Sequence, residues 1–172
     1  MRCLSSPSGS REKVLNSGAT TVGNTGIIRG GNATGDGTLT LGSSLTIGSG
    51  GTLSTKIAST SATANLVAAT GAFTFNSAGK VLIDGNNVAF NPATSYTYTI
   101  ASSGTSTAGL NVTDQSVFSF ANFTNSGDFT FSLTGNAGGA VFLNFAPVPE
   151  PGAILAVCGL AVGGVAAWRR RK

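Results

Sequence analysis

The sequence predicts an all-β fold. Polar and apolar residues alternate over many short segments, which is the pattern of strands that bury one face. Gly and Asn separate these segments at nearly even intervals, as tight corners between strands require. Helical periodicity is not found before Pro147. Together these features favour a series of short strands.

The first strands are expected between residues 16 and 55. Residues 38–41 (TLTL) and 44–47 (SLTI) alternate, and residues 51–54 (GTLS) begin a further strand. A period of two places the apolar side chains inward and their Thr and Ser neighbours outward. Short strands with tight Gly corners at even spacing are typical of a solenoid. The side chains expected to point inward are Leu39, Leu41, Leu45 and Ile47.

The same pattern continues with larger side chains between residues 65 and 145. Alternation is found at residues 73–75, 96–100, 118–120 and 129–133. We expect Phe73, Phe75, Phe129 and Phe131 to belong to the same buried stack. Residues 80–83 and 140–143 are more continuously apolar, which predicts strands covered on both faces.

Two segments of this body carry a resemblance to a known family. Residues 37–57 (GTLTLGSSLTIGSGGTLSTKI) and residues 68–85 (AATGAFTFNSAGKVLIDG) resemble autotransporter-associated β-strand repeats. The resemblance implies a right-handed parallel β-helix, in which each coil buries its apolar positions against its neighbours. The alternative to a parallel β-helix is that the strands form an antiparallel β-sandwich.

Charge divides the chain into three parts. Only 9% of the 172 residues are charged, while 41% are hydrophobic and ten are Phe, which is enough for a core. Residues 18–146, the expected solenoid-like domain, are almost neutral, and the basic residues gather near the termini. A nucleic-acid binder would instead carry its basic residues on a folded face, so nucleic acid is not expected as a partner.

Residues 1–17 are expected to be an unstructured N-terminal segment. They contain no apolar run of the length that a secretory signal peptide requires. Because the other end of the chain is typical of an exported protein, we expect the sequence to be the C-terminal part of a longer protein or to have a misassigned start.

The composition argues against an enzyme. The chain has no His, so a Ser-His-Asp site or a Cys-His site cannot be formed, and with two Cys a zinc cluster is not expected either. The body's four carboxylates are isolated in sequence, and Asp36 and Asp84 stand next to Gly as turn residues do. No catalytic residue, no metal and no cofactor is therefore expected.

Residues 147–172 form a distinct tail. Its prolines exclude a helix interior and strand pairing, which predicts an extended, accessible segment. An uncharged stretch follows, suited to a single membrane-spanning helix, and basic residues then stop the transfer and stay cytoplasmic. The extended segment is Val148, Pro149, Glu150, Pro151 and Gly152; the anchor includes Ala153, Ile154, Leu155, Val157, Leu160, Val162, Val165 and Trp168; the cations are Arg169, Arg170, Arg171 and Lys172.

This order of parts resembles the PEP-CTERM sorting signal of bacteria with a two-membrane envelope. The match consists of Pro149-Glu150-Pro151, the apolar stretch and the basic end. The resemblance implies recognition by an exosortase, a membrane-embedded cysteine transpeptidase, and removal of the tail. It also implies anchoring in the inner membrane with the C-terminus cytoplasmic, then transfer to the cell surface, where exopolysaccharide or surface matrix is a further expected partner.

Two functions follow as hypotheses. The first is an exported structural or adhesin-like surface protein that is itself the substrate of the sorting enzyme. The alternative is the C-terminal anchor of a larger secreted, polysaccharide-acting enzyme whose catalytic part lies upstream.

Overall fold

The structure is a computed structural model that describes residues 13–15, 18–31, 37–57 and 64–149. Within these ranges the chain forms short strands and two single-turn 3-10 helices, so the all-β prediction is confirmed. The elements are β1 (Lys13–Leu15), β2 (Thr20–Val22), β3 (Ile27–Arg29), β4 (Thr38–Leu41), β5 (Leu45–Ile47), β6 (Thr52–Lys56), β7 (Leu66–Ala69), β8 (Phe73–Phe75), β9 (Lys80–Asp84), β10 (Tyr96–Ser102), β11 (Asn111–Val112), η1 (Gln115–Val117), β12 (Phe118–Ala121), η2 (Ser126–Asp128), β13 (Phe129–Gly135) and β14 (Ala140–Pro147).

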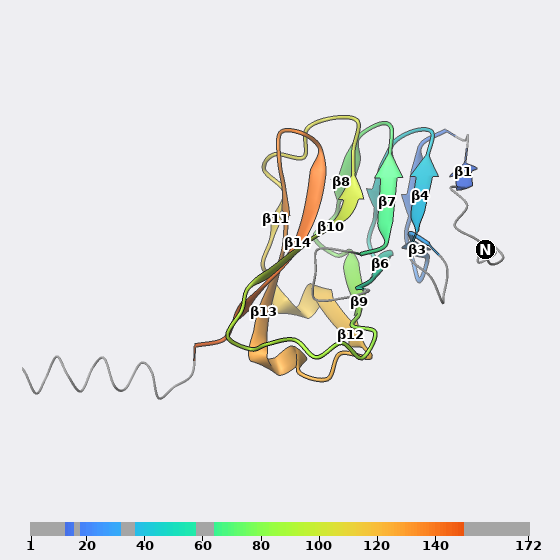
Figure 1. Cartoon of the computed structure of the whole chain (residues 1–172). Helices are drawn as coiled ribbons and strands as arrows, with labels where there is room; N and C mark the ends of the chain where they lie inside the picture. Colours follow the sequence, from blue (N-terminus) through green and yellow to red (C-terminus); the bar gives the residue numbers. More distant parts are fainter. Residues whose placement is uncertain (1–12, 16–17, 32–36, 58–63, 150–172) are drawn as a thin grey trace, which may run out of the picture.

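The strands lie in three sheets that the chain visits in turn. Sheet A has the order β1-β4-β7-β10-β14-β13-β11, sheet B the order β2-β5-β8, and sheet C the order β12-β9-β6-β3. One circuit therefore takes the chain through one strand of each sheet, as in β4, β5 and β6. Strands of successive circuits pair in parallel, and Figure 1 shows β1, β4 and β7 side by side in sheet A.

The register between circuits keeps equivalent residues side by side. In sheet B, Thr21 pairs with Thr46, and Thr46 pairs with Thr74, so the steps are 25 and 28 residues. Because side chains alternate along a strand, this register places apolar residues next to apolar residues on the inner side. Thr21 and Thr74 are exposed on the outer side of the sheet.

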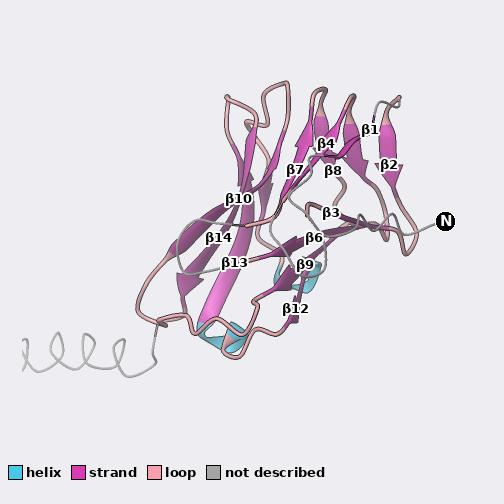
Figure 2. Ribbon diagram, turned by 45° about the vertical axis from the view of Figure 1, so that its right-hand side comes forward, coloured by secondary structure: helices cyan, strands magenta, loops and turns pink. Residues whose placement is uncertain are grey.

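In sheet C the register produces a continuous apolar column. Ile28 pairs with Leu53, Leu53 with Val81, and Val81 with Phe118, and all four side chains are buried. Figure 2 shows their strands β3, β6, β9 and β12 in succession. Burying one such aliphatic side chain stabilises the fold by about 1.5–3 kcal/mol, which makes the column a main source of stability.

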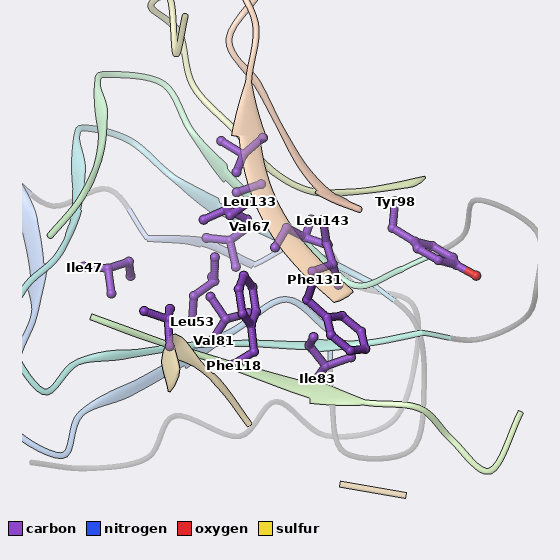
Figure 3. Packing of buried hydrophobic residues seen from close by; sticks show 14 of the residues in the cluster. Ile47, Leu53, Val67, Val81, Ile83, Tyr98, Phe118, Phe131, Leu133 and Leu143 are labelled. Atoms are coloured by element: carbon purple, nitrogen blue, oxygen red, sulfur yellow. The ribbon is translucent and has the colours of Figure 1, made fainter. Parts of the chain in front are cut away.

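The core lies where the three sheets face one another. Ile47 of sheet B, Leu53 and Val81 of sheet C, and Val67 of sheet A belong to one buried cluster, and each is 0% exposed. Figure 3 shows these side chains converging from different strands. One hydrophobic core therefore unites the three sheets.

Glycine is required at one close approach between circuits. Gly51 is buried directly before β6, and a Cβ atom there would clash with the carbonyl group of Val22 in the preceding circuit. The preceding residue, Gly50, has a φ of +70°, which side chains rarely tolerate. The Gly48-Ser49-Gly50-Gly51 segment thus provides the sharp corner that its composition predicted.

The parallel pattern changes at the C-terminal end. In sheet A, β10 pairs antiparallel with β14, β14 with β13, and β13 with β11. Past β11, the Gln115 side chain acts as a partner for β13. Its amide oxygen accepts a bond from the Phe131 N–H at 2.9 Å, and its amide nitrogen donates to the Phe131 carbonyl at 2.8 Å. Sheet A is therefore a mixed sheet.

An aromatic cluster fills the space under this antiparallel end. Phe90 stacks on Phe123 with ring centroids 4.8 Å apart and meets Tyr96 edge-on at 5.2 Å. Phe145 lies 5.3 Å from both Phe90 and Phe131. Such pairs contribute about 0.5–1.5 kcal/mol each beyond the area they bury. The cluster therefore ties the loop between β9 and β10 to the last strands.

The predicted inward side chains are mostly buried. Leu41, Leu45, Ile47, Phe73, Phe129 and Phe131 belong to the core, while Leu39 and Phe75 are partly buried and pack against it. The prediction that residues 80–83 and 140–143 are covered on both faces is only partly correct. Val81 and Ile83 are buried, but Leu82 and Phe142 remain partly exposed because β9 and β14 alternate like the other strands.

One expectation about the N-terminal segment needs correction. Residues 13–15, within the range expected to be unstructured, form β1 and pair with residues 39–41 of β4. The parallel edge of β4 provides backbone partners that sequence patterning in residues 1–17 does not reveal. Residues 1–12 and 16–17, the rest of that range, lie outside the described part of the chain.

Sheet C carries a polar contact that spans its strands. The Arg29 guanidinium, at the end of β3, lies 3.3 Å from a carboxylate oxygen of Asp84 at the end of β9, so its side chain extends across β6. The other Asp84 oxygen accepts bonds of 3.0 Å from the Asn122 side chain and the Asn86 N–H. This carboxylate therefore connects β3, β9 and the residue after β12.

The environment lowers the pKa of Asp84 below its ordinary value of 3.8. Burial alone raises this pKa, but the hydrogen bonds from Asn122 and Asn86 and the charges of Arg29 and Lys56 together outweigh that effect. Because the folded state has the lower pKa, the resulting stabilisation is present above the unfolded pKa of about 3.9 and is lost as the pH falls through the folded value.

Core burial predicts a large effect at Leu53. Leu53→Ala should lower the free energy of unfolding by about 3 kcal/mol, because it leaves a cavity in the middle of the sheet C column. The matched control is Ile27→Ala in β3, a side chain that is 63% exposed and should cost less than about 0.5 kcal/mol. Urea titration of the detergent-solubilised chain, followed by far-UV circular dichroism, measures both; similar losses would contradict the inward register of Leu53.

The Asp84 contacts predict a pH-dependent loss. Asp84→Asn should lower the free energy of unfolding by about 1 kcal/mol near pH 7, and the difference from the unmodified protein should vanish near pH 2. Asp128→Asn, at an exposed carboxylate of η2, is the control. A loss for Asp84→Asn that stays the same at both pH values would show that its charge does not stabilise the fold.

Candidate functional site

The predicted extended segment begins where β14 leaves the body. β14 ends at Pro147, and the Val148 N–H donates a 2.9 Å hydrogen bond to the Asp128 carbonyl of η2. Val148 is 43% exposed, and Pro149 is exposed. The structure therefore places these two residues at the surface, directly after the last strand.

Local chemistry explains why the pairing stops here. Antiparallel strands bond through their N–H and C=O groups, and proline has no N–H. Pro147 still pairs with Phe129, the first residue of β13, but Pro149 follows two residues later and cannot donate a further bond. The two prolines on either side of Val148 thus mark the end of the sheet.

The remaining predicted residues of the tail lie outside the described part of the chain. These are Glu150, Pro151 and Gly152 of the extended segment, the anchor residues of 153–168, and the cations Arg169, Arg170, Arg171 and Lys172. Among the residues that are described, none lies in a helix of sufficient length and apolarity to span a membrane. The anchor and its orientation therefore stay predictions.

Of the three described carboxylates of the body, Asp84 and Asp114 have separate structural roles. Asp84 accepts bonds at the end of β9, as described above. Asp114 caps η1 by accepting a 2.9 Å bond from the Ser116 N–H, and the contacts with Ser116 lower its pKa. Asp128 lies in η2. Within the described ranges, no group of three or more His, Cys, Asp or Glu side chains is placed to hold a metal ion.

Two contacts, one at Asp84 and one at Val148, could not be predicted from the spacing of residues in the sequence. The sequence predicts that Asp84 is a turn residue, and the bond that its carboxylate accepts from the Asn86 N–H fits this prediction, but Arg29 is 55 positions away. Val148 was assigned to the accessible segment, yet its N–H is bonded to the body. The apolar run from Ala140 to Phe145 was the available signal, because a strand that ends so close to Pro147 and Pro149 brings Val148 next to the sheet.

Comparison with protein families gives a match to the tail. The model of the PEP-CTERM protein-sorting motif matches residues 147–172. Comparisons with curated proteins and with solved structures found no match. The matched residues begin at the last residue of β14, so the motif follows the folded body without a linker. This chain therefore carries a C-terminal segment similar to PEP-CTERM motifs, which suggests export and sorting at a membrane by an exosortase-type system.

Proposed function

We propose that this chain is an exported surface protein whose tail is the substrate of an exosortase-type transpeptidase. The observation that carries the proposal is the sorting-motif match at residues 147–172, directly after the last strand. The chain contributes no catalytic group to this reaction. It presents Pro149-Glu150-Pro151 to the enzyme, which removes the residues that follow.

The chemistry of the tail supports this role. The prolines favour an extended conformation, which a peptidase needs in its substrate, and Glu150 is a single charge available for recognition. Residues 153–168 are uncharged, and four cations follow, so the stretch suits a membrane anchor with a cytoplasmic end. Tryptophan is a residue type that suits a membrane interface and arginine is one that can snorkel, so the presence of Trp168 and the terminal arginines fits an anchor of this modest length.

The short connection limits how far the body stands from the membrane. Four residues, 149–152, separate Val148 from the start of the apolar stretch. An extended chain spans at most about 3.6 Å per residue, so these four residues reach about 14 Å. The end of the body formed by β13, β14 and η2 therefore lies close to the membrane surface during export.

The body is proposed to be a short solenoid of the parallel β-helix type, with a structural or adhesin-like role. Its support is the repeated circuit through sheets A, B and C with parallel pairing between circuits. The outer row of Thr21, Thr46 and Thr74 presents hydroxyl groups at a regular spacing, which suits hydrogen bonding to exopolysaccharide or surface matrix. The structural roles of Asp84 and Asp114 support a non-enzymatic body.

Processing predicts a specific effect of tail charges. Glu150→Ala, or replacement of all four terminal cations by Asp, should leave the body folded and reduce the cleaved product by at least about tenfold, because recognition and membrane orientation depend on these charges. The measurement compares the masses of the precursor and the surface-released form in a host that carries the matching exosortase.

The control for this test is Asp128→Ala, which removes an exposed carboxylate from the body and keeps the tail intact. Normal cleavage is expected for this variant. A released form that still ends in Arg-Arg-Arg-Lys, or normal cleavage after both tail changes, would show that the tail acts only as an anchor.

Membrane attachment predicts the outcome of carbonate extraction. The unprocessed chain should stay in the membrane pellet, because an integral anchor resists alkaline washing. A chain truncated after Gly152 should appear in the wash. Release of the full-length precursor into the wash would contradict anchoring by residues 153–168.

A further inference from the structure

The three residues before Pro149, Ala146 to Val148, are held by the body on one side only. Phe145 pairs with Tyr96 of β10 on one side and with Phe131 of β13 on the other. Tyr96 is the first residue of β10, so among the described residues the next part of β14 has β13 as its one neighbour. From Ala146 onward, β14 is a one-sided extension of sheet A.

Few interactions hold this extension. The Val148 N–H bonds to the Asp128 carbonyl at 2.9 Å, and the Thr130 hydroxyl donates to the Ala146 carbonyl at 3.3 Å. Pro147 has no N–H to contribute. The Ala146 and Val148 side chains are exposed and Pro147 is partly buried, so release of the extension uncovers apolar surface mainly at the pair of Pro147 with Phe129.

The extension ends at Phe145, which is held in place by burial in the core. Its side chain is 1% exposed and packs against Tyr98 and Phe131, each with ring centroids at 5.3 Å. Peeling β14 beyond Phe145 would expose the aromatic cluster. Strand ends with few buried contacts open far more readily than core strands, so the opening stops at this residue.

The extension occupies backbone groups that a peptidase needs. An enzyme that binds an extended peptide pairs with main-chain groups on both sides of the bond it cuts. In the folded body, the three residues that precede Pro149 already use such groups to bond β13 and η2. The body itself also lies next to the motif, since no linker separates them.

We propose that release of Ala146–Val148 from β13 is the step that admits the sorting segment to the transpeptidase, with Phe145 as the fixed end. This inference rests on the proposed function. Only the released fraction of molecules is competent for cleavage, so the apparent efficiency is the intrinsic one multiplied by that fraction. The body thereby sets the rate at which its own tail is processed.

The test locks the extension with a disulfide. Thr130 and Ala146 are cross-strand partners, both are exposed, and paired Cα atoms in such strands lie about 5 Å apart, which a disulfide can bridge. Thr130→Cys with Ala146→Cys, in a full-length chain carrying Cys3→Ser and Cys158→Ala, is oxidised, purified in detergent and given to the purified matching exosortase. The cleavage rate should fall by at least about tenfold.

Two controls separate locking from other effects. The single variants Thr130→Cys and Ala146→Cys cannot form the bridge and should be cleaved at least as fast as the unlocked chain, because neither adds a restraint and Thr130→Cys also removes the hydroxyl bond to the Ala146 carbonyl. Thr97→Cys with Asn144→Cys joins β10 to β14 at a partner pair inside the sheet and should also leave the rate unchanged, because it does not hold the extension.

A rescue variant sharpens the test. Insertion of Gly-Ser-Gly-Ser between Val148 and Pro149 moves the motif four residues away from the last hydrogen bond, so it should restore cleavage in the locked protein. The same insertion between Ala137 and Gly138, in the exposed connection between β13 and β14, should not.

The outcomes distinguish the two proposals. Normal cleavage of the locked protein, or failure of the Val148 insertion to restore cleavage, would overturn the release step. Absence of cleavage in the unlocked Cys3→Ser, Cys158→Ala chain, when a synthetic peptide of residues 143–172 is also left uncut, would instead contradict the proposed function.

Discussion

The parallel register between successive circuits is the constraint on which the rest of the structure depends. Each strand from β1 to β9 bonds to strands one circuit away, and the same pairing stacks Ile28, Leu53, Val81 and Phe118 into one buried column. A shift by one residue would turn these side chains outward and leave the centre of the body polar. Backbone bonding and core packing are therefore two results of one alignment.

This alignment explains how much of the fold the sequence could predict. Alternation is local, so the strands around Leu41, Leu45 and Phe131 could be identified from their own residues. Closure at the C-terminal end could not, because the antiparallel pairing of β10, β14 and β13 depends on residues far apart in the chain. The Arg29–Asp84 contact and the pairing of β1 were missed for the same reason.

The candidate site shows the same division. Its prolines, apolar stretch and cations are contiguous, so the tail could be recognised from its sequence, and the family comparison agrees at residues 147–172. How the tail joins the body is set by the non-local bond between Val148 and Asp128. A linear motif is thus easily found, while its accessibility depends on the fold that precedes it.

The number of circuits sets the length of the body, while a separate part of the fold, the C-terminal hairpin, closes it. A circuit adds one strand to each sheet, and neighbouring strands lie about 4.8 Å apart, so duplication of a 28-residue unit such as residues 45–72 would lengthen the body by about that amount. The hairpin of β13 and β14, the aromatic cluster and the tail would stay as they are. Tandem duplication in the gene could therefore produce bodies that differ in length by uniform increments, all ending in the same hairpin and the same PEP-CTERM-like segment.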